Sequence, residues 1–156
     1  MAELKQEHLQ AVLGSIGHVL QGHLQYSQIE YGDVSKEASQ TLTVEQIAVV
    51  VGVTGDVQGD LIVTMREDMV KEIIGRMFGG MEIATIDEMG WSAYGEFGNW
   101  LGAGCCTSLS DCGLNVNITP PMISEGSTRL HSSNHFISIP FKADNHAFSV
   151  HISIQP

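Results

Sequence analysis

The sequence predicts an α+β fold in which three main helices pack on a mostly antiparallel β-sheet. In three segments, apolar residues recur at steps of three and four, which is the period of an amphipathic helix. Elsewhere, β-branched and apolar residues form short runs or alternate with polar ones, as they do in strands. The 156 residues are 43% hydrophobic, and no linker-like segment divides them. We therefore expect one domain spanning residues 1–156.

The three predicted helices have recognisable ends. The first spans Glu3 to Gln25, and the second runs from Arg66 to Phe78, where Gly79-Gly80 provides a C-terminal stop. The third begins near Asp87, a favourable N-cap residue, and continues toward Ser110. Gly113 is expected to end it.

Strands are predicted between and after these helices. The runs Gln46–Thr54 and Asp60–Met65 are joined by GDVQG, whose glycines and aspartate suit a tight turn, so they form a hairpin. Three more strands are expected at Asn115–Thr119, His135–Phe141 and Ala147–Ile154.

Composition excludes several classes of function. A net charge of −11 with only seven lysines and arginines argues against nucleic-acid binding and suits a basic protein partner. No apolar stretch approaches the roughly 20 residues that span a bilayer, and no signal peptide is recognisable, so we expect a cytoplasmic protein with no membrane contact.

Cysteines and methionines are expected to be structural. Cys105, Cys106 and Cys112 lack CxxC spacing, which indicates neither disulfides nor zinc. The histidines also predict no metal site. Five methionines are interpreted as core residues that fill gaps between elements. They are Met65, Met69, Met77, Met81 and Met89.

The third predicted helix has two different faces. At about 100° per residue, Ser92, Glu96, Asn99 and Ala103 fall within a stripe roughly 60° wide. The opposite side is apolar and is expected to anchor the helix. Its residues are Ala93, Tyr94, Phe97, Trp100, Leu101, Cys105 and Leu109.

This helix is also rich in glycine. Each glycine in a helix interior costs about 0.5–1 kcal/mol relative to alanine, so their number calls for a packing or docking reason. Gly95, Gly102 and Ala103 flank the polar stripe, and we expect these small residues to let the backbone of a partner approach.

The spacing Ser92-x3-Glu96-x2-Asn99 resembles the signature of the CheC/CheX/FliY family of chemotaxis phosphatases, and the chain is most similar to the CheX type. Further segments share the likeness in order: Gly52–Met65, Met77–Ile83, Asp87–Met89 and Ile118–Gly126. Members of the CheC type carry the motif twice. Here the first helix offers only Glu7 and Gln10, without the preceding serine, and one site per chain fits CheX.

The resemblance implies a phosphatase that hydrolyses the aspartyl phosphate of a CheY-like response-regulator receiver domain. Asn99 would orient the attacking water and Glu96 would dock the partner's active-site lysine, with Ser92, Gly95, Gly102 and Ala103 in contact with the partner. No cofactor of its own is implied, because Mg²⁺ is expected on the phosphorylated partner. The resemblance also implies a homodimer formed through the sheets, with the C-terminal strands as the expected edge.

Two alternatives remain open. The first is a non-catalytic binding module for a response regulator or for a flagellar or sensory complex, and the second is a ligand-sensing or scaffold domain. A docking module tolerates many polar residues at position 99, whereas positioning a water molecule requires an amide of that length. Asn99 therefore favours the enzyme.

Overall fold

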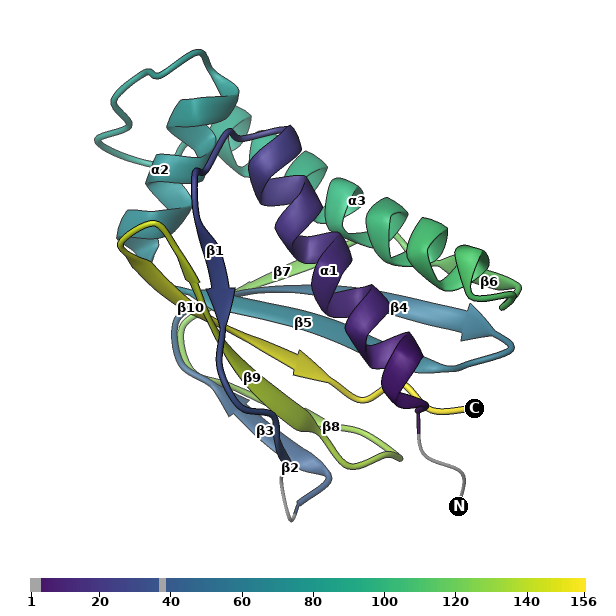
Figure 1. The fold of residues 1–156 in the computed structure, drawn as a ribbon. Coiled ribbons are helices and arrows are strands. Elements are labelled where there is room, and N and C mark those ends of the chain that lie inside the picture. Colours follow the sequence, from purple (N-terminus) through teal and green to yellow (C-terminus); the bar gives the residue numbers. More distant parts are fainter. Residues whose placement is uncertain (1–3, 37–38) are drawn as a thin grey trace.

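Three helices cover one face of an eight-stranded sheet in the computed structural model, which describes residues 4–36 and 39–156 (Figure 1). They are α1 (Gln6–Gly22), α2 (Glu67–Met77) and α3 (Glu88–Asp111). The predicted fold class is confirmed, and each helix lies within a few residues of its expected bounds. Glu3, the expected start of the first helix, lies outside the described residues.

The sheet is antiparallel and follows the order β1-β9-β10-β5-β4-β6, with β2 also paired to β9 and β7 to β4. Two further strands, β3 and β8, form a separate ribbon. The strands are β1 (Ile29–Tyr31), β2 (Ser35–Lys36), β3 (Thr41–Val44), β4 (Ile47–Gly55), β5 (Gly59–Met65), β6 (Val116–Ile118), β7 (Met122–Glu125), β8 (Thr128–His131), β9 (Ile137–Ala143) and β10 (His146–Ile152).

The position of the C-terminal strands corrects one expectation. Strand β10 lies between β9 and β5, and the other side of β9 is paired with β1 and β2. Neither strand is therefore the free edge that the sequence suggested. The two edges of the sheet are instead formed by the short strands β1 and β2 on one side and by β6 and β7 on the other.

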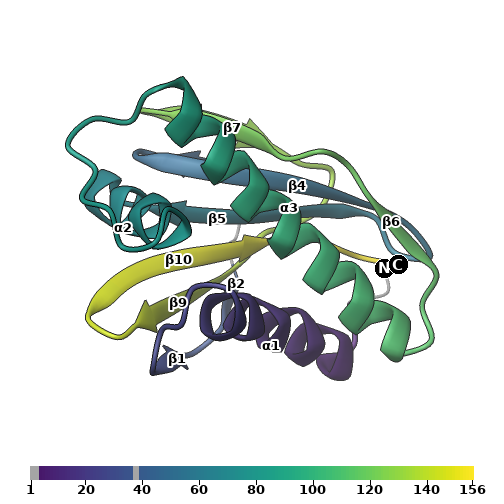
Figure 2. The same cartoon turned by 90° about the horizontal axis from the view of Figure 1, so that it is seen from above.

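Apolar residues form a core on each face of the sheet. The larger core lies between the helices and the sheet, while a smaller one lies under the β3–β8 ribbon. The smaller core consists of Leu42, Val44, Ala48, Ile62 and Phe136. Helix α3 crosses the helix-covered face diagonally, beside α1 and α2 (Figure 2).

Two glycines bring α3 unusually close to the sheet. A Cβ atom on Gly98 would lie 2.8 Å from side-chain atoms of both Pro121 and Val49, and one on Gly102 would lie 2.8 Å from Ile118 and 3.0 Å from Val51. Real Cβ atoms essentially never approach within 3.0 Å, so position 98, beside the rigid ring of Pro121, fits only glycine, and a Cβ at position 102 would have to displace the end of the Ile118 side chain. From the sequence, we expect a packing or docking reason for the glycines of this helix. For Gly98 and Gly102 the reason is packing against the sheet.

The other helices pack against α3 through small residues as well. Gly104 faces Val19 and Ser15 of α1, and Gly90 faces Ile74 of α2. Within residues 4–36 and 39–156, no helix combines the length and the apolar character needed to cross a membrane.

We predict that Gly98→Val lowers the free energy of unfolding by about 1–3 kcal/mol, because overpacking at this contact forces α3 away from β4. Gly95→Ala is the matched control, since nothing lies within 4 Å of a Cβ placed there. It should raise stability by about 0.5–1 kcal/mol through helix propensity. Urea denaturation measures both, and equal stability of the two variants would contradict this account of the contact.

Candidate functional site on helix α3

Helix α3 starts at a well-defined cap. The carboxylate of Asp87 accepts a hydrogen bond of 2.8 Å from the backbone N–H of Gly90, and Glu88 places a negative charge in the first turn. Both features favour the N-terminus of a helix, where N–H groups lack partners and the dipole is positive. The cap fixes where the helix begins and hence the register of every residue after it.

The apolar face of α3 is buried as predicted. Tyr94, Phe97, Leu101, Cys105 and Leu109 are all buried in the main core. Trp100 lies at the margin of this face. Its ring is half-buried and stacks on His23, at the end of α1, with 4.3 Å between the ring centroids. The buried face sets the rotation of α3 about its own axis.

The polar stripe consequently faces away from the protein. Ser92, Glu96, Asn99 and Ala103 are all exposed. The side-chain amide of Asn99 donates a hydrogen bond of 3.3 Å from Nδ2 to Oε2 of Glu96. The structure therefore brings together the two residues that were predicted to be catalytic.

Gly95 and Gly102 do not share one environment. Gly95 is partly exposed and has open space beside it, whereas Gly102 is buried between α3 and the sheet. On the helical wheel, Gly102 stands about 80° from Ser92, toward the strand side. Its small size serves the contact with Val51 and Ile118, so the expectation that it faces a partner is corrected.

The hydrogen bond between Asn99 and Glu96 orients the amide. A carboxylate accepts only, so it selects the amide nitrogen and leaves Oδ1 of Asn99 as the acceptor directed to its surroundings. Its carbonyl oxygen can accept a hydrogen bond from a water molecule without the amide ionising. The pair thus presents one neutral acceptor and one carboxylate, one helical turn apart on an exposed surface.

Two of the expected core methionines are exposed. Met65 and Met69 are buried as predicted, but Met81 and Met89 lie on the surface. Met81 follows α2 in the connection to α3, and Met89 stands in the first turn of α3. The interpretation as core residues was wrong for these two. For Met89 the helical wheel does indicate exposure, because this residue falls about 60° from Ser92, on the polar side.

The cysteines are in different environments. Cys105 is buried, and burial, with a smaller contribution from the neighbouring Cys106, raises its pKa to about 12. Cys106 is partly exposed and donates a hydrogen bond of 3.3 Å from Sγ to the carbonyl oxygen of Val116. In the described part of the chain, no group of three or more His, Cys, Asp or Glu residues is placed to hold a metal ion.

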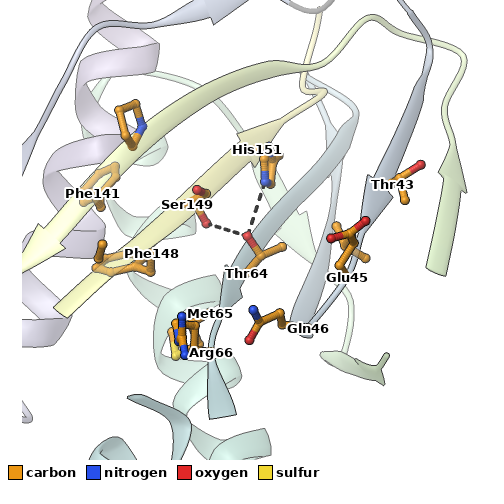
Figure 3. Close-up of a pocket in the computed structure, with 13 residues that line it drawn as sticks. Thr43, Glu45, Gln46, Thr64, Met65, Arg66, Phe141, Phe148, Ser149 and His151 are labelled. Atoms are coloured by element: carbon orange, nitrogen blue, oxygen red, sulfur yellow. Dashed lines mark hydrogen bonds between the residues drawn. The ribbon is translucent and has the colours of Figure 1, made fainter. Parts of the chain in front are cut away.

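A separate hollow of about 410 Å³ lies on the face of the sheet turned away from α3 (Figure 3). There the hydroxyl of Thr64 is 3.4 Å from Nε2 of His151 and donates a long hydrogen bond of 3.5 Å to the carbonyl oxygen of Ser149. Thr64 is directly opposite Ser149 in the register of β5 and β10. The sheet separates this hollow from Glu96 and Asn99.

Comparison with known proteins identifies the family. The profile of the family "Chemotaxis phosphatase CheX" matches residues 47–142, a range that includes the exposed stripe of α3. The "CheY-P phosphatase CheX" of Thermotoga maritima is 30% identical over 111 residues, which cover 70% of this chain and 72% of that protein. The chain belongs to the CheX family. The resemblance drawn from the motif is thereby confirmed.

Solved structures of CheX proteins share the fold. A chemotaxis protein CheX from Desulfovibrio desulfuricans superposes with a TM-score of 0.81 at 21% identity, covering 96% of this chain and 99% of that one. The CheX of a CheX-CheY-BeF₃-Mg²⁺ complex from Borrelia burgdorferi has a TM-score of 0.75 at 21% identity, covering 97% and 100%. At these identities the likeness concerns the fold.

We predict that Cys105 of the folded protein resists thiol reagents, because burial keeps it protonated and the thiolate is the reactive form. Labelling with a chromogenic disulfide at pH 8 should modify equal numbers of thiols in the native parent and in Cys105→Ala. After denaturation the parent should yield one more. A native parent that already yields one more would show Cys105 to be accessible.

Proposed function

We propose that this CheX-family chain hydrolyses the aspartyl phosphate of a CheY-like receiver domain, using Glu96 and Asn99. The observation that carries the proposal is the exposed, hydrogen-bonded carboxylate and amide on the outer face of α3. The relative from Thermotoga maritima is named a CheY-P phosphatase, and the structural relative from Borrelia burgdorferi is in complex with CheY, which supports the choice of partner.

In the proposed reaction, a water molecule attacks phosphorus as the bond to the aspartyl oxygen breaks. The carboxylate leaves with the electron pair, and the proton of the water passes to the released phosphate or to solvent. The receiver domain brings its own Mg²⁺ and lysine, which stabilise the phosphoryl oxygens. This chain then needs only to hold the water in line.

Asn99 and Glu96 have separate roles in this scheme. Oδ1 of Asn99 accepts a hydrogen bond from the attacking water and holds it on the far side of phosphorus from the leaving oxygen. Glu96 pairs with the receiver's lysine, which fixes the docking register, and it also holds the amide of Asn99. Ser92, Gly95 and Ala103 lie along the same stripe and are proposed to contact the receiver domain.

The remaining parts of the proposal concern assembly and location. A homodimer formed through the sheet would use an edge, either β1 and β2 or β6 and β7, because β9 and β10 are paired on both sides. With a receiver domain of a chemotaxis pathway as the substrate, we also propose a cytoplasmic location.

We predict that Asn99→Ala removes most of the catalysed hydrolysis and leaves binding of the receiver domain nearly unchanged. A hundredfold acceleration corresponds to about 2.7 kcal/mol, which one well-placed hydrogen-bonding group can supply. The measurement is phosphate release from a receiver domain phosphorylated by a small donor, with binding measured in parallel. Asn117→Ala, at an exposed asparagine of β6, is the matched control and should behave as the parent.

Binding without acceleration by the parent would instead favour the docking module. Equal rates for Asn99→Ala and the parent would remove Asn99 from the mechanism.

We predict that Glu96→Gln separates the two roles of Glu96. Glutamine can still accept a hydrogen bond from Asn99 but loses the charge that pairs with lysine, so KM should rise about tenfold or more while kcat changes little. Glu96→Ala removes both interactions and should impair KM and kcat together. Steady-state kinetics against receiver concentration tests this, with Asp111→Asn, at the end of α3, as the control. Identical kinetics for the Gln and Ala variants would contradict the division of roles.

A further inference from the structure

Two exposed methionines line a hollow beside the N-terminus of α3. Met81 is 60% exposed and Met89 is 69% exposed, which is unusual for such apolar side chains. Together with Phe78 and Ile83 they line a hollow of about 540 Å³ between the α2–α3 connection and the first turn of α3. Methionine is flexible and polarisable, so a surface of this kind adapts to an apolar side chain of a partner.

Hydrogen bonds hold the walls of this hollow in place. Gly79 and Gly80 have positive φ values of 78° and 94°, which turn the chain back over α2. The N–H groups of Gly80 and Met81 then both donate to the carbonyl oxygen of Gly75, at 2.8 and 3.1 Å. A Cβ on Gly75 would lie 2.3 Å from the carbonyl oxygen of Met81, so only glycine permits this crossing. The backbone on the α2 side of the hollow is therefore held in place.

The hollow continues the surface that carries the proposed catalytic pair. Met89 stands three residues before Ser92 and seven before Glu96, so it lies about 10 Å from Glu96 along the helix axis and only about 20° from it around the helix. The N-terminal end of α3 lies beside the α2–α3 connection (Figure 2). A globular domain seated on Glu96 and Asn99 must also pass over Met89.

The charges around the hollow have one sign. The segment 77–128 contains no lysine, arginine or histidine, and all its charged residues are acidic: Glu82, Asp87, Glu88, Glu96, Asp111 and Glu125. Glu82 and Asp87 line the hollow itself. The nearest cations, on and beside α2, are each in an ion pair: Arg66 with Asp68, Lys71 with Glu67 and Arg76 with Glu72. A partner that covers this surface must supply basic residues.

We propose that this hollow receives an apolar side chain of the phosphorylated receiver domain, flanked by basic residues and located roughly 10–15 Å from the phosphoryl group. The inference rests on the proposed function, because the occupant is the same partner. The apolar contact and the acidic rim fix the direction of approach, while Glu96 and Asn99 act on the phosphoryl site. Docking is thus assigned to the N-terminal end of α3 and the connection before it, and chemistry to α3 about two turns further on.

The test uses Met89→Asp and Met81→Asp, with Met122→Asp as the matched control. Met122 is 73% exposed but is opposite Val50, which packs in the smaller core on the other face of the sheet. A CheY protein of the same organism, loaded with Mg²⁺ and beryllofluoride, serves as the probe for Kd, and its phosphorylated form for KM and kcat. Met89→Leu keeps an apolar side chain of similar size and tests for rescue.

We expect the two hollow variants to raise Kd and KM at least tenfold with kcat within twofold of the parent, and Met122→Asp and Met89→Leu to match the parent. Glu82→Lys should slow association several-fold and flatten its dependence on salt. If Kd is unchanged in both Met89→Asp and Met81→Asp, the docking assignment is overturned. The proposed function still stands in that case if the parent dephosphorylates the receiver. If the parent binds the probe but does not dephosphorylate the receiver, the proposed function fails, and the Kd comparison still decides whether the hollow is the docking site. If the parent does not bind the probe, both the docking assignment and the proposed function are overturned.

Discussion

The close contact between α3 and the sheet determines which residues of α3 face outward, including the candidate functional residues. At Gly98 and Gly102 the helix backbone rests directly on side chains of β4 and of the β6–β7 segment. A helix held by its backbone can neither rise nor rotate without breaking that contact. Because Tyr94 and Phe97 are buried on the same side, the residues diametrically opposite must face outward. Glu96 and Asn99 owe their exposure to these constraints.

The same constraint explains why a glycine-rich helix is tolerated. Glycine weakens a helix intrinsically, yet α3 is long, has an Asp87 cap and buries large aromatic side chains, so packing outweighs propensity. The glycines also differ in purpose. Gly90, Gly98, Gly102 and Gly104 each face another element, whereas Gly95 faces open space. Close packing thus accounts for Gly90, Gly98 and Gly102, whereas a Cβ at Gly104 would make only ordinary contacts. Gly95 is left beside the proposed docking surface.

The sequence was sufficient to predict the elements with strong periodicity and the exposed stripe of α3, because burial of one helical face and exposure of the other follow directly from spacing. It did not predict β1, β2, β3, β7 and β8, which are two to four residues long, so any alternation in them covers at most four residues. Gly102 was misplaced because a wheel angle does not reveal how near the sheet lies. Met81 and Met89 were misplaced because an apolar side chain is expected inside unless a partner covers it.

In the proposed reaction, an acidic protein acts on an anionic phosphoryl group, and an amide at position 99 would avoid the resulting repulsion. Two unit charges of like sign 4 Å apart repel by about 4 kcal/mol at an effective dielectric constant near 20. A carboxylate at position 99 would place such a charge beside the anionic phosphoryl oxygens. An amide offers a neutral acceptor, while the carboxylate of Glu96, one turn away, is proposed to pair with the receiver's lysine. The acidic rim around Met81 and Met89 can then attract basic residues on the receiver's surface without opposing the charge at its centre.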